Sequence, residues 1–212
     1  DGFDDVLIGA YSPSLGSLNY VDSTYLIFGH AGVWSSPLAL SSLNGSNGVI
    51  IKGIAGLLSG SPVSLAGDVN GDGFDDVLIG AFHAFPGFLT DAGSTYLVFG
   101  HRGAWSSSLV LGSLNGTNGV AINGIAAGDQ SGYSVASAGD VNGDGFDDVL
   151  IGAYGASPGG ISGAGSTYLI FGHAGVWSMP LALSSLNESN GVIINGVVAS
   201  EFSGISVASA GD

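Results

Sequence analysis

Residues 68–81 read Asp-Val-Asn-Gly-Asp-Gly-Phe-Asp-Asp-Val-Leu-Ile-Gly-Ala, and the same stretch recurs unchanged at residues 140–153. A shorter copy, which starts at the Asp-Gly pair of the motif, occupies residues 1–10. Each copy is a polar loop of Asp, Asn and Gly followed by an apolar run. Such a run between turn residues predicts a β-strand, and its recurrence along the chain predicts a repeat architecture.

Other landmarks recur with the same period of about 72 residues, including the Phe-Gly-His ends at His30, His101 and His173 and the tryptophans at Trp34, Trp105 and Trp177. We therefore divide the chain into three repeats, residues 1–71, 72–143 and 144–212. The acidic loop of the first repeat is truncated at its start, and the third repeat ends at Asp212, the first position of a further loop. This pattern predicts either that the chain is part of a longer array of repeats or that copies of the chain continue one another head to tail.

Each repeat has the composition of strands separated by turns. In the second repeat and at its borders we predict strands at Phe74–Ala81, Ser94–Phe99, Val120–Ile125 and Gly132–Ala138. Short helical turns are expected only within Pro37–Leu43 and Ser108–Leu114. Four strands in about 72 residues are typical of a propeller blade, which cannot bury both of its faces alone. The predicted fold is all-β, with about three tandem four-stranded antiparallel blades.

The charge of the chain is extreme, with a formal net charge of −15 and only Lys52 and Arg102 as cationic residues. Nucleic-acid binding is excluded on this ground, because phosphate contacts need Lys or Arg. No apolar run approaches the roughly 18 residues of a membrane helix, so membrane insertion is not expected. Most acids are clustered, and a cation is needed to offset their mutual repulsion. The clusters are Asp1/Asp4/Asp5, Asp68/Asp72/Asp75/Asp76, Asp140/Asp144/Asp147/Asp148 and Asp212.

The acidic loop offers oxygen donors at its positions 1, 3, 5 and 9, a glycine at position 6 and a backbone carbonyl at position 7. Hard oxygen ligands without nitrogen or sulfur favour Ca²⁺. An EF-hand is excluded because its position-12 glutamate is replaced by Ile79 or Ile151, inside a predicted strand. The alternative interpretation is a polar turn without a metal. It is the weaker one, because the loop recurs at the same position of each repeat.

Residues 132–153, from Gly132-Tyr-Ser-Val-Ala-Ser-Ala-Gly-Asp140 through the acidic loop to Ala153, are similar to the FG-GAP repeat of the integrin α-subunit propeller and of large bacterial surface proteins. The resemblance extends over the whole chain. It implies calcium bound by the acidic loop between two strands of a blade. The ligands it implies are Asp68, Asn70, Asp72, the Phe74 carbonyl and Asp76; Asp140, Asn142, Asp144, the Phe146 carbonyl and Asp148; and, in the truncated loop, Asp1, the Phe3 carbonyl and Asp5, with Asp212 of a neighbouring copy in the matching place.

The sequence departs from the family pattern at the motif's name-giving residues. The Phe-Gly position is Ser-Gly at residues 59–60, 131–132 and 203–204, and the Gly-Ala-Pro position ends in an aromatic residue at Tyr11, Phe82 and Tyr154. Three blades are also fewer than the four to eight of a propeller. A closed ring therefore needs further repeats or other chains, and an open head-to-tail array is the alternative. The expected partners are other copies of the repeat and a protein or glycan ligand.

Three further residue sets have competing interpretations. Asn44, Asn115 and Asn187 each begin an Asn-x-Ser/Thr sequon, which predicts N-glycosylation or an incidental turn. The histidines of the Phe-Gly-His ends, His30, His101 and His173, are expected to be structural turn residues and not ligands of a shared metal, because they lie on separate blades. The three tryptophans are expected to fill seams between blades, with a sugar-stacking platform as the alternative. No nucleophile motif or isolated acid pair is present, so we expect no enzymatic activity.

The sequence therefore predicts a calcium-binding, extracellular or cell-surface repeat module with a structural or adhesive role, as part of an array or filament. Two alternatives remain open. One is a non-catalytic propeller region of a large secreted enzyme, and the other is a carbohydrate-binding surface.

Overall fold

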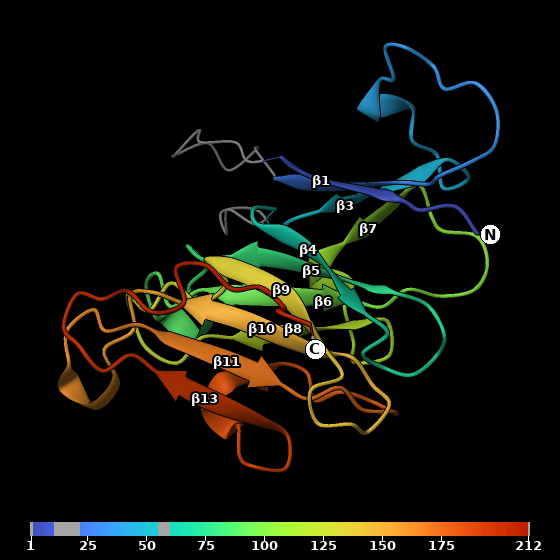
Figure 1. Cartoon of the computed structure of the whole chain (residues 1–212). Coiled ribbons are helices and arrows are strands. Elements are labelled where there is room, and N and C mark those ends of the chain that lie inside the picture. Colours follow the sequence, from blue (N-terminus) through green and yellow to red (C-terminus); the bar gives the residue numbers. More distant parts are fainter. Residues whose placement is uncertain (1, 11–21, 55–59, 212) are drawn as a thin grey trace.

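The computed structural model describes residues 2–10, 22–54 and 60–211. In this part of the chain the regular structure consists of β-strands and single 3₁₀ turns, arranged in three sheets. Figure 1 shows the sheets following one another in chain order, from the N-terminal strands through the middle sheet to β13. None of the described residues forms a helix that is long and apolar enough to cross a membrane.

The first sheet has the order β1-β2-β3-β7. The strands are β1 (Val6–Ala10), β2 (Ser23–Ile27), β3 (Gly48–Lys52) and β7 (Ser108–Val110), and the 3₁₀ turn η1 (Leu40–Ser42) lies between β2 and β3. Neighbours pair antiparallel except for β7, which comes from the second repeat and pairs in parallel with β3.

The second sheet has the order β12-β8-β6-β5-β4 and the third β13-β11-β10-β9. The second consists of β4 (Val63–Gly67), β5 (Asp76–Ala81), β6 (Ser94–Val98), β8 (Gly119–Asn123) and β12 (Leu181–Ala182). The third consists of β9 (Ser134–Gly139), β10 (Asp148–Ala153), β11 (Ser166–Ile170) and β13 (Gly191–Asn195). The remaining 3₁₀ turns are η2 (Pro86–Phe88), η3 (Leu111–Ser113), η4 (Pro158–Gly160) and η5 (Leu183–Ser185).

Strands are shared across the repeat boundaries. The acidic loops join β4 to β5 and β9 to β10, so each of these sheets begins with a strand that precedes its acidic loop. At the other edge, β3 and β8 each receive a short parallel strand, β7 or β12, from the following repeat. Adjacent repeats are thus joined by backbone hydrogen bonds as well as by packing.

The hydrophobic core consists of two clusters, one on each face of the middle sheet. Successive side chains of a strand point to opposite faces, and β5 divides accordingly: Val77 and Ile79 belong to the cluster shared with the first sheet, whereas Leu78 belongs to the cluster shared with the third. All three are at most 5% exposed. The middle sheet is therefore buried on both faces by its neighbours.

The end sheets each leave one face open. On β13, Val192 and Ile194 are 42% and 48% exposed, whereas their repeat counterparts on β8, Val120 and Ile122, are fully buried. The same sequence pattern is therefore covered or open according to whether a following sheet is present.

The structure confirms the predicted fold class. The four predicted strands correspond to β5, β6, β8 and β9, and the 3₁₀ turns η1 and η3 fall within the two predicted helical turns. Phe74 and Asp75 precede β5 because they are still part of the acidic loop. The three sheets of the described residues do not close into a ring.

The covered and open faces predict a difference between two matched substitutions. Ile122→Ala removes a fully buried side chain and should lower the free energy of unfolding by about 2–5 kcal/mol. Ile194→Ala, at the same repeat position on exposed β13, should cost less than about 1 kcal/mol in dilute protein. Denaturant unfolding measures both, and equal losses would contradict the assigned difference in burial.

Candidate metal centre

The two complete acidic loops occupy equivalent places in the second and third sheets. Gly67 faces Asp76 across β4 and β5, and Gly139 faces Asp148 across β9 and β10, each beside an irregularity of the strand register. The first and last loop positions are therefore close together at the mouth of a hairpin. This placement follows from the local sequence, in which an Asn-Gly-Asp-Gly turn separates two strand-forming runs.

Inside the loop, the first aspartate is surrounded by backbone donors. Oδ1 of Asp68 accepts hydrogen bonds from the N–H groups of Gly71 (2.8 Å) and Asp72 (3.0 Å), and Oδ2 accepts one from Gly73 (2.8 Å). Asp140 makes the same three bonds at 2.7–3.0 Å in the third repeat. Gly71 and Gly73 both have positive φ, which explains the glycines at these two positions.

The aspartate at loop position 9 connects the loop to the end of the next strand. Asp76 is fully buried; its Oδ2 accepts the Val69 N–H (3.1 Å) and its Oδ1 the Gly100 N–H (2.8 Å). Asp148 makes the equivalent bonds to Val141 and Gly172, both at 2.9 Å. In the first repeat, Asp5 accepts the Gly29 N–H at 2.8 Å. The glycine of each Phe-Gly-His end therefore donates its N–H to the last aspartate of the acidic loop in its own repeat.

The middle positions of the loop bond to one another. Asn70 Oδ1 accepts the Asp72 N–H at 2.8 Å, and Asn70 Nδ2 donates to Asp72 Oδ2 at 3.2 Å. Asp72 Oδ1 in turn accepts the Phe74 N–H at 3.0 Å. Asn142, Asp144 and Phe146 repeat this arrangement. Phe3 and Asp5 are described in the first repeat, whereas Asp1 and Asp212 lie outside the described residues.

Burial disfavours the ionised form of the aspartate at loop position 9. Burial raises the pKa of Asp76 to about 7; the two backbone hydrogen bonds lower it, and the nearby charges of Asp72 and Asp68 raise it further. The pKa of Asp148 is raised for the same reasons, with Asp144 and Asp140 as the nearby acids. Each loop therefore concentrates negative charge around a buried carboxyl group.

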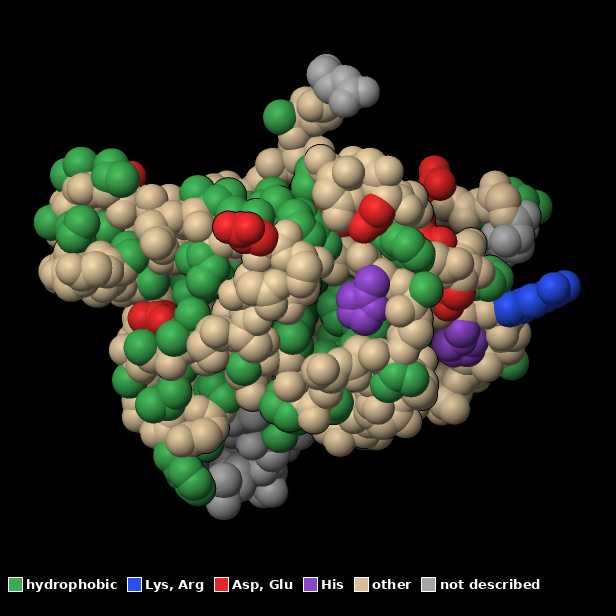
Figure 2. Space-filling model, turned by 90° about the horizontal axis from the view of Figure 1, so that it is seen from below, with side chains coloured by type: hydrophobic (Ala, Val, Ile, Leu, Met, Phe, Trp, Pro, Cys, Tyr) green, Lys and Arg blue, Asp and Glu red, His purple; other side chains and the backbone are tan. Residues whose placement is uncertain are grey.

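The residues of the loop fit a hard divalent cation by their chemistry, because every side-chain donor is a carboxylate or amide oxygen. In the described residues no three His, Asp or Glu side chains converge in the arrangement of a metal site; the loop carboxylates are instead directed to backbone N–H groups. Figure 2 shows acidic side chains in separate small patches on one face of the molecule, with very few cationic groups among them.

Neighbouring acidic loops are in direct contact, which the sequence did not indicate. Asp147 Oδ2 accepts the Asp68 N–H at 2.8 Å, and the Asp147 N–H donates to the Asp68 carbonyl at 3.1 Å. A Cβ added at Gly71 would collide with the ring of Phe146. Asp147 is thus the acid that links the second loop to the third, and only the packing of adjacent sheets could reveal this.

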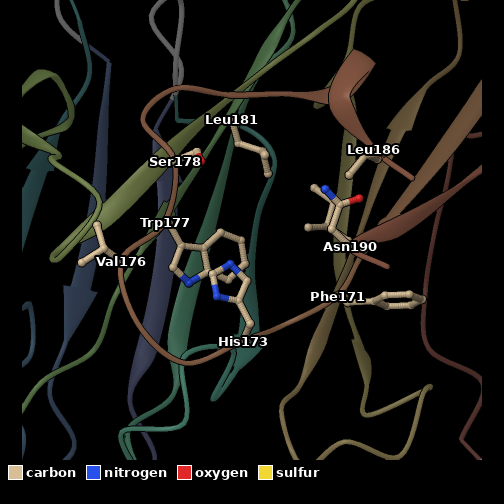
Figure 3. Close-up of a pocket in the computed structure, with 9 residues that line it drawn as sticks. Phe171, His173, Val176, Trp177, Ser178, Leu181, Leu186 and Asn190 are labelled. Carbon is tan, nitrogen blue, oxygen red and sulfur yellow. The ribbon is translucent and has the colours of Figure 1, made fainter. Parts of the chain in front are cut away.

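The histidines and tryptophans form a stacked pair in each repeat. The ring centroids are 4.7 Å apart for His30–Trp34, 4.3 Å for His101–Trp105 and 4.3 Å for His173–Trp177. Figure 3 shows His173 and Trp177 together among the residues that line a pocket. The volume of this pocket is about 120 Å³. Trp177 is buried and contacts Phe99 of the preceding repeat, whereas Trp34 is 42% exposed. The indole at this position fills a seam wherever a preceding repeat is present.

The three sequon asparagines are exposed and share one local geometry. Asn44 Oδ1 accepts hydrogen bonds from the Ser46 N–H (3.0 Å) and hydroxyl (2.7 Å). Asn115 and Asn187 make the same pair of bonds with Thr117 and Ser189. Each sequon is therefore a turn at the surface. This geometry is compatible both with N-glycosylation and with an incidental turn.

The fold and the loops define a tandem β-sheet repeat protein. The family model described as FG-GAP repeat matches residues 62–98 and 131–170, which contain β4–β6 and β9–β11 with the two complete acidic loops. These two segments are FG-GAP repeats, as the sequence predicted. The chain is also similar to Integrin alpha-3 of Mus musculus (34% identity over 105 residues, 49% of this chain and 9% of that protein) and Integrin alpha-6 of Gallus gallus (31% over 86 residues, 41% and 7%). It spans less than a tenth of either relative.

The contact between loops predicts unequal effects for two corresponding acids. Asp147→Ala removes the acceptor of the Asp68 N–H and should destabilise the protein by about 1–3 kcal/mol. Asp75→Ala, the exposed counterpart in the second repeat, should change stability by no more than about 0.5 kcal/mol. Chemical unfolding with chelator present gives both values; a larger effect at Asp75 would argue against the loop-to-loop contact.

The raised pKa of Asp76 predicts a pH dependence in the absence of metal. The unfolded chain releases this proton near the ordinary pKa of 3.8, whereas the folded chain holds it until about pH 7. The folded state therefore binds more protons across this interval, and stability should fall as pH rises through it. Asp76→Asn should flatten that slope in unfolding experiments with chelator, whereas an unchanged slope would exclude Asp76 as a main source.

Proposed function

We propose that this chain is a calcium-binding, non-enzymatic repeat module of an extracellular or cell-surface protein, with an adhesive or structural role. The observation that carries the proposal is the pair of acidic loops, which are identical in sequence and in their internal hydrogen bonds and which lie within the segments that match the FG-GAP repeat. The integrin relatives support the adhesive role.

The electrostatics of the loops support a bound cation. Asp76 is buried without a cationic side chain among the groups that shift its pKa, and the acids Asp68 and Asp72 act against its ionisation. A divalent cation would reverse this effect by favouring the ionised form. Ca²⁺ is favoured over softer metals because the donors are all oxygens.

When bound, calcium would supply the positive charge that each loop lacks. Asp68, Asn70, Asp72, the Phe74 carbonyl and Asp76 would hold it in the second repeat, and Asp140, Asn142, Asp144, the Phe146 carbonyl and Asp148 in the third. Asp76 and Asp148 also hold the glycines that follow β6 and β11. The last loop acids thus connect each proposed calcium loop to the end of the next strand of its own sheet, β6 or β11.

The burial of Trp177 weighs against the carbohydrate-binding alternative. A sugar platform needs exposed aromatic faces, whereas Trp177 is 3% exposed and packs against Phe99. The other alternative, a non-catalytic propeller region of a secreted enzyme, shares the calcium loops and differs in the domains that accompany the repeats. The exposed asparagines Asn44, Asn115 and Asn187 are suitable acceptors for N-glycans if the chain passes through a glycosylating secretory route.

Calcium titration tests the proposal. Isothermal titration calorimetry should find two sites per chain, with Kd values of about 0.1–1 mM, the range of extracellular calcium modules. At a calcium concentration of 100 Kd, each site should add about 2.7 kcal/mol to the free energy of unfolding. Asp144→Ala should remove one site, and Asp75→Ala, outside the proposed ligands, should remove none. Equal melting temperatures in calcium and in chelator would refute the calcium role.

A further inference from the structure

Three loops lie next to one another at the end of the sheets opposite the acidic loops. They connect β5 to β6 (residues 82–93), β8 to β9 (residues 124–133) and β10 to β11 (residues 154–165). Backbone hydrogen bonds join them: the Gln130 N–H donates to the Asp91 carbonyl at 2.9 Å, and the Gly155 N–H donates to the Asp129 carbonyl at 3.2 Å. In Figure 1 the arrows of β10 and β13 point to this end of the molecule, whereas the arrow of β9 points to the end with the acidic loops.

These loops expose large apolar side chains. In the loop between β5 and β6, Phe88 is 95% exposed, Phe85 47% and Leu89 39%. Ile125 in the second loop and Ile161 in the third are 36% and 37% exposed. Adjacent loops thus present apolar groups to solvent together, which is typical of an interaction surface. We call the three loops the apolar end.

Folding of the chain does not account for Phe88. Its φ is 69°, in the left-handed region where a bulky side chain is unfavourable. The third repeat has Gly160 at the same position, with a φ of 81°, and it forms the same 3₁₀ turn. The turn therefore needs no phenylalanine, yet Phe88 is strained and nearly all of its surface is in water. Backbone strain of this kind is found where a residue has a role other than folding.

The loop that carries Phe88 is held in one shape. The Phe88 N–H donates to the Phe85 carbonyl at 3.2 Å. On either side of this turn, His83 Nδ1 and Asp91 Oδ1 are 2.9 Å apart, so that a side-chain contact closes the base of the loop. An ordered loop presents its aromatic rings with little further loss of conformational entropy on binding.

The apolar end carries little free charge. The sequence of its three loops contains no Lys or Arg, and its acids are Asp91 and Asp129. Asp91 contacts His83, and Asp129 is buried and accepts the Ala126 N–H at 3.0 Å. Contact with an apolar medium would therefore remove little charge from water. An anionic surface would gain no attraction there, because attraction of that kind needs Lys or Arg.

We propose that the apolar end docks on a neutral, zwitterionic lipid bilayer, with Phe85, Phe88 and Leu89 inserted between the headgroups and the first acyl carbons. A bilayer fits this surface better than the pocket of a protein partner, because the apolar side chains stand on separate loops of two repeats and a fluid medium can surround each of them. Docking of this kind needs no spanning helix. The acidic loops, at the other end of the sheets, would stay in water, so the proposal does not depend on calcium.

Flotation with phosphatidylcholine vesicles in chelator tests the docking. The natural chain should float with the vesicles. The double variant Phe85→Ser/Phe88→Gly should have a partition coefficient lower by about tenfold or more, because two phenyl rings no longer leave water. Its residues are those with which the third repeat forms the same turn, so the fold is retained, and circular dichroism checks this. Phe88→Gly alone should also weaken binding, without a fall in melting temperature.

Val33→Ser is the matched control for these variants. Val33 is 96% exposed but follows β2 at the end of the acidic loops, where Asp5 accepts the Gly29 N–H. Loss of its side chain should leave binding to the vesicles unchanged. Weaker binding by this variant, to the same extent as by Phe88→Gly, would show general adhesion of exposed apolar groups and would overturn the proposal.

Three other outcomes would overturn it as well. One is the absence of binding to phosphatidylcholine at every lipid concentration, which would assign the exposed phenylalanines to a protein partner instead. Another is equal binding by the natural chain and the double variant. The third is binding that requires both phosphatidylserine and calcium and is unaffected by the double variant, since it would place the contact at the acidic loops.

Fluorescence locates the contact. Compared with the natural chain and its three tryptophans, Phe88→Trp should add emission that shifts to shorter wavelength on phosphatidylcholine vesicles and is quenched by brominated acyl chains. Val33→Trp, at the other end of the sheets, should show neither effect. Equal quenching of the added emission in both proteins would contradict docking by the apolar end. These results are independent of calcium binding at the acidic loops, so the two proposals can fail separately.

Discussion

The structure depends above all on the burial of each sheet's apolar faces against the sheets on either side. A single four-stranded sheet of this kind has apolar side chains on both faces, so it cannot remove them from water alone. The middle sheet satisfies this constraint completely: Leu78 faces one seam and Ile79 the other, and both are fully buried. Among the described residues, the end sheets satisfy it on one face only: Val192 and Ile194 of the third sheet are 42% and 48% exposed.

The acidic loops are a second constraint, imposed on this packing. Each loop encloses a buried aspartate, and the sheet contacts bring one loop against the next through Asp147 and Asp68. The negative charges of adjacent loops repel one another, and the apolar packing between the sheets opposes this repulsion. A cation at the loops would relieve that repulsion at the point where consecutive repeats meet, so the proposed calcium role and the repeat architecture support each other.

Much of this was accessible from the sequence because repetition made local signals unambiguous. The strands followed from apolar runs between Gly, Asn and Asp. The recurring oxygen-bearing side chains of the loop are visible in its spacing, and their role as calcium ligands stays a prediction. The His–Trp stacks and the contact of Asp147 with Asp68 did not follow, since each depends on which side chains approach after the strands have paired. The raised pKa of Asp76 could not be derived either, because its main cause is burial in the folded sheet.

The sequence by itself therefore determined the repeat, its strands and the chemistry of the acidic loops, because these properties depend on residues close together in the chain. Only the tertiary structure decided which copies of a repeated side chain are buried. Ile122 and Ile194 occupy the same repeat position, as do Trp177 and Trp34, yet one member of each pair is covered and the other is exposed. The physical reason is that burial depends on the neighbouring sheet, and a repeated sequence carries no local record of whether that neighbour is present.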